Sequence, residues 1–226
     1  MLLLGLVETS LELIPEDQLR HPSVLRLAKT RGKPPSQLLL DEATLPQVVA
    51  GLSEPAKHGR PDIAHRSLLL ALDSVLARTG HLQVFVHTVT DHVITIKPET
   101  RLPRREPRFV GLIEQLLHTG CAPQSGSPLL ELYSGSLDQY LHEITPTRTY
   151  LLTHTGTPMT PPEFTQILAG EPRPLVLVGG FAHGMLSPRI TQLASEKVSL
   201  HPDPLPTSTV VGIIVHNLET ILKVQE

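Results

Sequence analysis

Short apolar runs alternate along the chain with segments in which apolar residues repeat at the helical period. The runs are rich in valine, leucine and isoleucine, as buried strands are. Because helical patterns separate them, the alternation predicts an α/β fold with a mostly parallel sheet covered by helices. We expect the strands at 2–7, 37–40, 82–88, 92–96, 129–133, 149–153, 174–179 and 197–200.

The helical segments each show one apolar face. In 62–79 that face is followed by Gly80, a residue that often ends a helix. In 108–118 the same spacing places Arg108 at the positive N-terminal end of the helix dipole. We expect further helices at 136–143, 161–169 and 207–224, loops at 28–36 and 53–60, and a connector at 120–128.

The last predicted helix, 207–224, is apolar around most of its circumference, with Thr207 and Ser208 as possible N-caps. Two interpretations fit this pattern. The helix is buried twice, once against its own sheet and once against a second subunit, or it is the central core helix of a monomer.

Composition limits the class of protein. The 226 residues, 40% of them hydrophobic, fit one domain or one domain with an elaborated flank. A formal charge of -3 means that a nucleic-acid partner would have to bind a local basic patch. Cys121 is the single cysteine, which excludes an intrachain disulfide and a CxxC-type zinc site. The opening run 1–7 lacks a basic n-region, so we expect a buried strand there rather than a signal peptide, and no transmembrane run follows.

A basic patch is present at 97–108, where five cationic side chains and three prolines occur in twelve residues. Prolines prevent a continuous helix, so we expect Arg101, Arg104 and Arg108 to be presented from a stiff, extended loop. The planar guanidinium fork suits phosphates and base edges. The alternative is a solvated loop whose cations pair with its own two glutamates.

Three loops are expected to leave the carboxyl ends of predicted strands, at 153–158, 179–184 and 200–205. Ligands of open α/β sheets bind just beyond those ends, and the glycines of 179–184 allow close backbone approach. The alternative is that these glycines only form turns. No G-x-G-x-x-G and no P-loop motif occurs in the chain.

Other chemistry finds little support. The chain has twelve histidines, but none forms an H-x-x-x-H or H-x-H pair with a carboxylate at ligand spacing, so we expect no metal. The G-x-S-x-G nucleophile motif is absent, which argues against an α/β-hydrolase.

Four sequence blocks, in order and at matching spacing, carry a specific resemblance. They are HGRPDIAH at 58–65, LDS at 72–74, PETRLPR at 98–104 followed by Arg108 and Phe109, and GGFAHG at 179–184. From about residue 10 to the C-terminus the chain resembles the small-subunit ribosomal RNA pseudouridine nitrogen-1 methyltransferases, the nucleolar essential protein family of the SPOUT or α/β-knot superfamily.

The resemblance implies a SPOUT-type sheet with helices on both faces, a C-terminal trefoil knot and a homodimer. It implies a single domain over 1–226, with RNA-binding elements inserted at about 54–110. It also implies a cytoplasmic protein of archaeal type, nucleolar if eukaryotic.

The resemblance further implies two sets of site residues. The RNA contacts fall on Arg60, Arg101, Arg104 and Arg108, with Asp62 orienting Arg60. At 201–204 the chain departs from its relatives, which often carry a Ser/Asn/Tyr-type run, and Pro204 has no backbone N–H to donate. The S-adenosylmethionine contacts fall on Thr153, Gly179, Gly184, Leu200, His201, Pro202, Asp203, Pro204 and Leu205.

The implied reaction is transfer of the sulfonium methyl group to nitrogen-1 of a pseudouridine in a loop of small-subunit ribosomal RNA. The protein would splay the base out and hold it in near-attack geometry, and we assign no general base. Two alternatives stay open: an RNA-binding assembly factor with little or no catalysis, and a knotted ribose 2′-O-methyltransferase.

Overall fold

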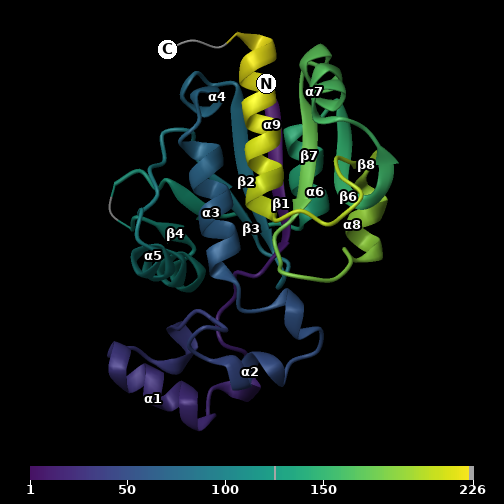
Figure 1. Cartoon of the computed structure of the whole chain (residues 1–226). Coiled ribbons are helices and arrows are strands. Elements are labelled where there is room, and N and C mark those ends of the chain that lie inside the picture. Colours follow the sequence, from purple (N-terminus) through teal and green to yellow (C-terminus); the bar gives the residue numbers. More distant parts are fainter. Residues whose placement is uncertain (125, 224–226) are drawn as a thin grey trace.

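The computed structural model describes residues 1–124 and 126–223, and its centre is a mixed sheet of eight strands (Figure 1). The strands are β1 Leu2–Thr9, β2 Leu82–Thr88, β3 Val93–Ile96, β4 Cys121–Ala122, β5 Leu130–Leu132, β6 Arg148–Pro158, β7 Pro174–Gly179 and β8 Glu196–Ser199.

The strand order is β4-β5-β3-β2-β1-β7-β6-β8. From β2 to β8 all neighbours are parallel, whereas β3, β5 and β4 extend the sheet with antiparallel pairs. The α/β expectation is therefore confirmed, with a mixed sheet in which the parallel part holds the central strands.

Helices cover both faces of this sheet (Figure 1). One apolar cluster lies under α3, α5, α7 and α9, and a second lies under α6 and α8. The helices are α1 Pro22–Arg31, α2 Pro46–Ala50, α3 Pro61–Leu72, α4 Val75–Arg78, α5 Glu106–Thr119, α6 Leu137–Ile144, α7 Pro161–Gly170, α8 Pro188–Leu193 and α9 Thr207–Leu222, with 3-10 turns η1 Glu16–Gln18, η2 Pro35–Gln37 and η3 Pro55–Lys57.

Strand β1 is apolar almost throughout because it is buried on both faces of the sheet. Leu4 and Leu6 pack into the first cluster, whereas Leu3 and Val7 pack into the second. Side chains alternate between the faces of a strand, so a central strand covered on both sides needs apolar residues at both parities.

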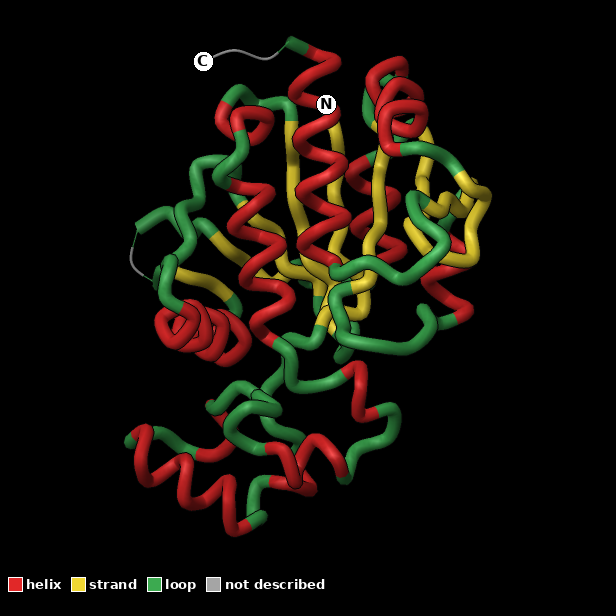
Figure 2. Tube along the Cα trace, viewed as in Figure 1, coloured by secondary structure: helices red, strands yellow, loops and turns green. Residues whose placement is uncertain are grey.

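Residues between β1 and α3 form a small lobe at the foot of the sheet, built from α1, α2 and long loops (Figure 2). The lobe has its own apolar cluster, which includes Val24, Leu38, Leu40 and Val48. We expected a strand at 37–40, which is wrong: Leu39 makes only an isolated bridge to Leu13. Leu38 and Leu40 are buried in the lobe instead of pairing in the sheet.

The loop expected at 28–36 is also wrong in its first part, because α1 runs through Arg31. The start of α1 is fixed by His21, whose ring accepts the backbone N–H of Ser23, and by Pro22 at the first helical position. Gly32 ends it in the left-handed region, at φ 62°. The loop expected at 53–60 contains the 3-10 turn η3.

The helix expected over 62–79 is two helices. The hydroxyl of Ser74 accepts the N–H of Ala77 and starts α4, so the chain turns between α3 and α4. Gly80 follows α4 with φ 74°, as expected of a residue that ends a helix. The helices α2 and α8, and strand β4 inside the expected connector at 120–128, are additional to the prediction.

The last helix begins at Thr207, as expected, but neither expected residue acts as a side-chain cap. The Thr207 hydroxyl instead donates to the carbonyl of Gly179, at 2.7 Å. The expected end at residue 224 lies outside the described residues. Within the described residues no helix is both long and apolar enough to cross a bilayer.

Candidate functional site

A cavity of about 390 Å³ lies beyond the carboxyl ends of β6, β7 and β8. Its walls come from β6, from the loops that follow β7 and β8, and from the first turn of α9. This is where parallel α/β sheets bind their ligands. The lining residues are Leu152, Thr153, His154, Val178, Gly179, Phe181, Ala182, His183, Gly184, Met185, Leu186, Leu200, His201, Asp203, Pro204, Leu205, Thr207 and Val210.

The structure brings together all but one of the residues predicted to contact the cofactor. Pro202 is not among the lining residues. Sequence reasoning placed the loop 179–184 at the ligand site, but it did not select the apolar side chains of Phe181, Met185 and Leu186 or the residues of α9 that also line the cavity. Those predicted residues that do line the cavity are Thr153, Gly179, Gly184, Leu200, His201, Asp203, Pro204 and Leu205.

The expected loop at 153–158 is wrong, because β6 continues to Pro158. Leu152 and Thr157 both pair with Val198 of β8, so the residues between them form a bulge. A bulge re-aims side chains without ending the strand, and this one brings Thr153 and His154 to the cavity wall.

The loop after β7 is fixed tightly against β1. The N–H of Gly180 donates to Val7, and its carbonyl accepts the N–H of Ser10. A Cβ added at Gly180 would lie 2.4 Å from Oγ1 of Thr9, so no larger residue fits there. Gly184 has φ 121°, a conformation that side chains rarely adopt, which lets the loop curve around the cavity.

A buried ion pair supports the same loop from behind. Glu8 accepts the N–H of Ser187 at 3.0 Å and the ammonium of Lys57 at 3.4 Å. Lys57 is 7% exposed, and its ammonium lies 5.5 Å from the ring centre of Phe181. The loop that lines the cavity is therefore held by a lysine from the segment that also carries Arg60, and no sequence motif points to this role.

Arg60 and Asp62 form a two-pronged ion pair at the start of α3. Nε of Arg60 donates to Oδ1 of Asp62 at 2.8 Å, and Nη2 donates to Oδ2 at 3.0 Å. The guanidinium lowers the pKa of Asp62 below its ordinary value, so this carboxylate is ionised and only weakly basic at neutral pH. The arrangement suits a residue that orients Arg60.

Residues 97–105 form a loop outside helices and strands, as expected, but it is not extended throughout, because the N–H of Thr100 donates to the carbonyl of Lys97 in a turn. Thr100 and Leu102 are buried, so Arg101 between them faces outward. Arg104 is exposed, and its Nη1 donates to Asp73 at 2.5 Å.

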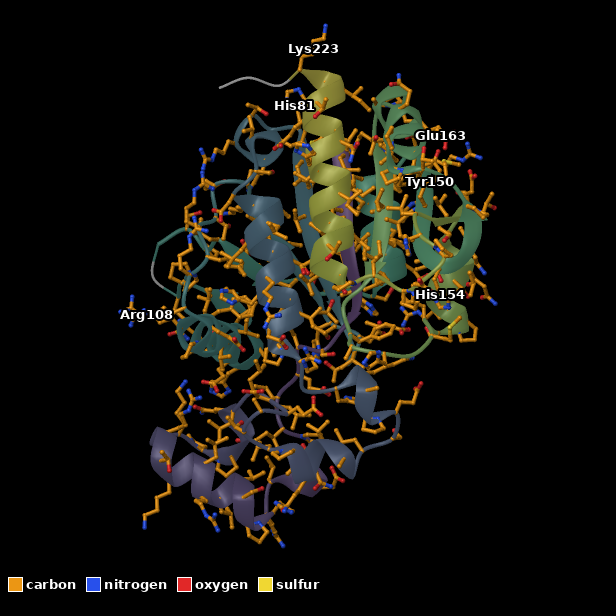
Figure 3. All side chains as sticks on the ribbon, in the orientation of Figure 1. His81, Arg108, Tyr150, His154, Glu163 and Lys223 are labelled. Carbon is orange, nitrogen blue, oxygen red and sulfur yellow. The ribbon has the colours of Figure 1, made fainter. Side chains whose placement is uncertain are left out.

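Arg108 lies in the first turn of α5, which confirms its predicted place at the N-terminal end of a helix, and it is not part of the loop. Figure 3 shows it pointing outward on the side of the molecule away from His154. An open hollow near it is lined by Pro103, Arg104, Arg105 and Arg108. Arg105 is a fourth exposed cation of this surface, present in the basic patch but not selected from the sequence.

His65 fixes the base of the arginine loop. Its Nε2 lies 2.7 Å from the carbonyl of Pro103, and its ring stacks on Phe109 with ring centres 4.5 Å apart. The histidine is 4% exposed and therefore has a packing role. Among residues 1–124 and 126–223 no group of three His, Cys, Asp or Glu side chains is arranged to hold a metal ion.

The fold and the site define an α/β protein with a small-molecule cavity at the ends of parallel strands and an arginine-rich surface near α3 and α5. The chain belongs to the EMG1/NEP1 methyltransferase family, whose model matches residues 5–219. The resemblance inferred from the four sequence blocks is thereby confirmed, and the protein is a methyltransferase.

Curated relatives match over almost the whole chain. The chain is 42% identical to the ribosomal RNA small subunit methyltransferase Nep1 of Thermococcus onnurineus, covering 97% of this chain and 98% of the relative. It is 40% identical to the protein of the same name from Thermococcus kodakarensis, covering 98% and 99%. Among solved structures, Archaeoglobus fulgidus Nep1 bound to S-adenosylhomocysteine superposes with a TM-score of 0.87 at 32% identity, covering 97% of this chain and 98% of that chain.

Proposed function

We propose that this methyltransferase transfers the methyl group of S-adenosylmethionine to nitrogen-1 of a pseudouridine in small-subunit ribosomal RNA. The observation that carries the proposal is the cavity beyond β6, β7 and β8, in a chain that matches Nep1 proteins along its whole length. Nitrogen-1 is free in the C-linked pseudouridine and bonded to the sugar in uridine, so this acceptor distinguishes the two nucleosides.

The cavity fits S-adenosylmethionine in size and chemistry. Its volume of about 390 Å³ lies in the range of small-molecule sites, and its lining combines apolar residues with polar ones such as Thr153 and Asp203. Leu152, Val178, Leu205 and Val210 would pack against the flat adenine and the carbon chain. Backbone groups of 200–205 would form hydrogen bonds with the polar edges of the cofactor. Pro202 and Pro204 would contribute only their carbonyls, because proline has no backbone N–H. When bound, the cofactor supplies an electrophilic methyl group.

Arg60, Arg101, Arg104 and Arg108 would bind the RNA, with phosphates and base edges as their targets. Arg60, oriented by Asp62, would hold the splayed base and stabilise negative charge on its ring as the proton leaves. Positioning alone can lower the barrier by about 7–11 kcal/mol in favourable cases, so this proposal requires no dedicated general base.

The protein is proposed to be a homodimer with a C-terminal trefoil knot. Each chain would form a single domain over 1–226, with RNA-binding elements at about 54–110, and the protein would be cytoplasmic. Support for the dimer comes from an open groove of about 760 Å³ between α3 and α9, whose lining includes Leu70, Val75 and Val215. Leu70 is 48% exposed. Sedimentation of the protein as a monomer at micromolar concentration would contradict the dimer.

Two substitutions test the division between the two sites. Arg101→Ala should weaken RNA binding at least about tenfold and leave S-adenosylhomocysteine binding unchanged, because it removes one phosphate-binding fork. Gly184→Val should do the reverse, because a β-branched residue at φ 121° distorts the cavity loop. Gly170→Val in α7, where a Cβ meets nothing within 4 Å, is the matched control for the glycine change. Equal effects of both variants on both ligands would contradict the division.

A further inference from the structure

Helix α1 and its flanks carry a second concentration of positive charge, separate from the arginine loop. Residues 20–33 contain five cationic side chains and no carboxylate, in a chain whose formal charge is -3. All five residues are exposed. They are Arg20, Arg26, Lys29, Arg31 and Lys33.

The cations of α1 face away from the lobe. Val24 and Ala28 form the buried side of the helix, and Arg26 and Lys29 lie on the opposite side, one turn apart. Two like charges at this spacing repel each other and destabilise an isolated helix. The face is therefore not explained by the stability of the helix.

Several exposed arginines elsewhere in the chain are paired with carboxylates. Arg104 has Asp73, Arg148 has Glu196, and Arg189 has both Asp91 and Asp138. Within residues 1–124 and 126–223, Arg20, Arg26, Lys29 and Arg31 have no carboxylate within ion-pair distance. The helix dipole accounts for cations in the last turn, Lys29 and Arg31, but not for Arg20 and Arg26.

The lobe is fixed to the helix that carries Arg108. Lys33 donates to Glu114 of α5 at 2.5 Å, and the second oxygen of Glu114 accepts the N–H of Leu39 at 3.2 Å. Glu114 is 3% exposed, so the carboxylate of this joint is buried, whereas the Lys33 side chain reaches it from the surface. Figure 1 shows α1 below α5 on the same side of the molecule, and Arg108 points outward on that side in Figure 3.

We propose that the exposed face of α1 is a second RNA-contact surface, which binds backbone phosphates of the segments flanking the target loop. Unpaired arginines and lysines on a rigid helix suit phosphates, and phosphate contacts position an RNA without reading its sequence. The inference rests on the proposed function, since it assigns part of the same RNA to a further surface.

The test uses two RNAs, a short stem-loop with the target pseudouridine and the same stem-loop extended by its flanking helices. Full-length protein carrying Arg26→Gln and Lys29→Gln is compared with wild type across a range of salt concentrations. Loss of two phosphate contacts should flatten the slope of log affinity against log salt by about 1.8 for the extended RNA, because the added segments are double-helical. Affinity for the extended RNA should fall at least about tenfold near 0.1 M salt, and affinity for the short RNA should not change.

The matched control is Lys197→Gln with Lys223→Gln, which removes the same charge from exposed residues outside the lobe. Lys223 lies at the far end of the molecule from α1 (Figure 3). Unchanged affinity and slope of the α1 variant on the extended RNA would overturn the inference, as would an equal loss in the control. Arg101→Ala, measured in parallel, separates this inference from the proposed function. If Arg101→Ala lowers the affinity for both RNAs and the α1 variant lowers neither, the α1 inference is refuted and the proposed function stands.

Discussion

At the scale of single residues, the proposed RNA site depends on an arginine that is oriented by a neighbouring carboxylate. This arginine is Arg60, a side chain placed by a two-pronged pair with Asp62. Asp62 also lies 3.3 Å from Arg66, one turn further along α3. One carboxylate in the first turn of the helix thus orders two cations at its positive end.

Asp62→Asn tests the role of this pair. The amide has the same shape but no charge, so it should orient Arg60 poorly, and kcat/KM for the RNA should fall about tenfold or more. Binding of S-adenosylhomocysteine should change little, because the Asp62 side chain lies outside the cavity. Single-turnover methyl transfer is the measurement. Wild-type transfer rates in the variant would show that the pair is dispensable.

His58 gives a pH-dependent prediction at the same scale. Its Nδ1 lies 2.8 Å from Glu12, and this hydrogen bond raises the pKa of His58 above 6.5. A raised folded-state pKa means that the stabilisation is fully present below the unfolded pKa of 6.5 and is lost as pH rises through the folded pKa.

The comparison is between wild type and His58→Gln in urea unfolding from about pH 5.5 to 8.5. The difference in unfolding free energy should be largest at the acidic end and should shrink toward the alkaline end. A difference that stays constant over this range would exclude the proposed coupling between His58 and Glu12.

At the scale of elements, the sequence predicted those strands and helices whose apolar residues follow a clear pattern. Strands such as β1 and β7 are continuous apolar runs, and α5 and α9 show a clear apolar face. Helices α1 and α2 were missed because each buries only two residues in the small lobe, which leaves no clear apolar face in the sequence. The β6 bulge was missed because it exists only through the pairing of Leu152 and Thr157 with one residue of β8.

The contact between η3 and the cavity loop leads to a prediction for Lys57→Met. Removing the ammonium leaves Glu8 buried without its cation, and Glu8 holds the N–H of Ser187. We expect the affinity for S-adenosylhomocysteine, measured by titration calorimetry, to fall about tenfold as the loop loosens.

Lys33→Met is the matched control, because it also removes the cation from a buried glutamate, Glu114, at a joint outside the cavity. It should lower stability without changing cofactor affinity. Restored affinity in the double variant Lys57→Met with Glu8→Gln would support the positioning role. Equal cofactor affinities in wild type, Lys57→Met and Lys33→Met would refute it.

At the scale of the whole molecule, the two predicted sets of site residues occupy different places. The cofactor set comes from three chain segments that the sequence placed at the carboxyl ends of predicted strands, and the family resemblance supplied its individual residues. The arginine set lies at the start of α3, on the 97–105 loop and in α5. Arg101, Arg104 and Arg108 were visible as a charge pattern, whereas Arg60 was assigned from the family resemblance. The supporting residues Lys57, Glu8 and His65 were not predictable, because their partners lie far away in the chain.

The most direct test of the account is methyl transfer from radiolabelled S-adenosylmethionine to two matched RNA stem-loops, one with pseudouridine at the target position and one with uridine. The account predicts label on the pseudouridine RNA alone, because only that base has a free nitrogen-1. Label on both RNAs would contradict it and indicate a ribose 2′-hydroxyl acceptor. RNA binding without label on either would also contradict it, and would favour an assembly factor that binds the RNA without modifying it.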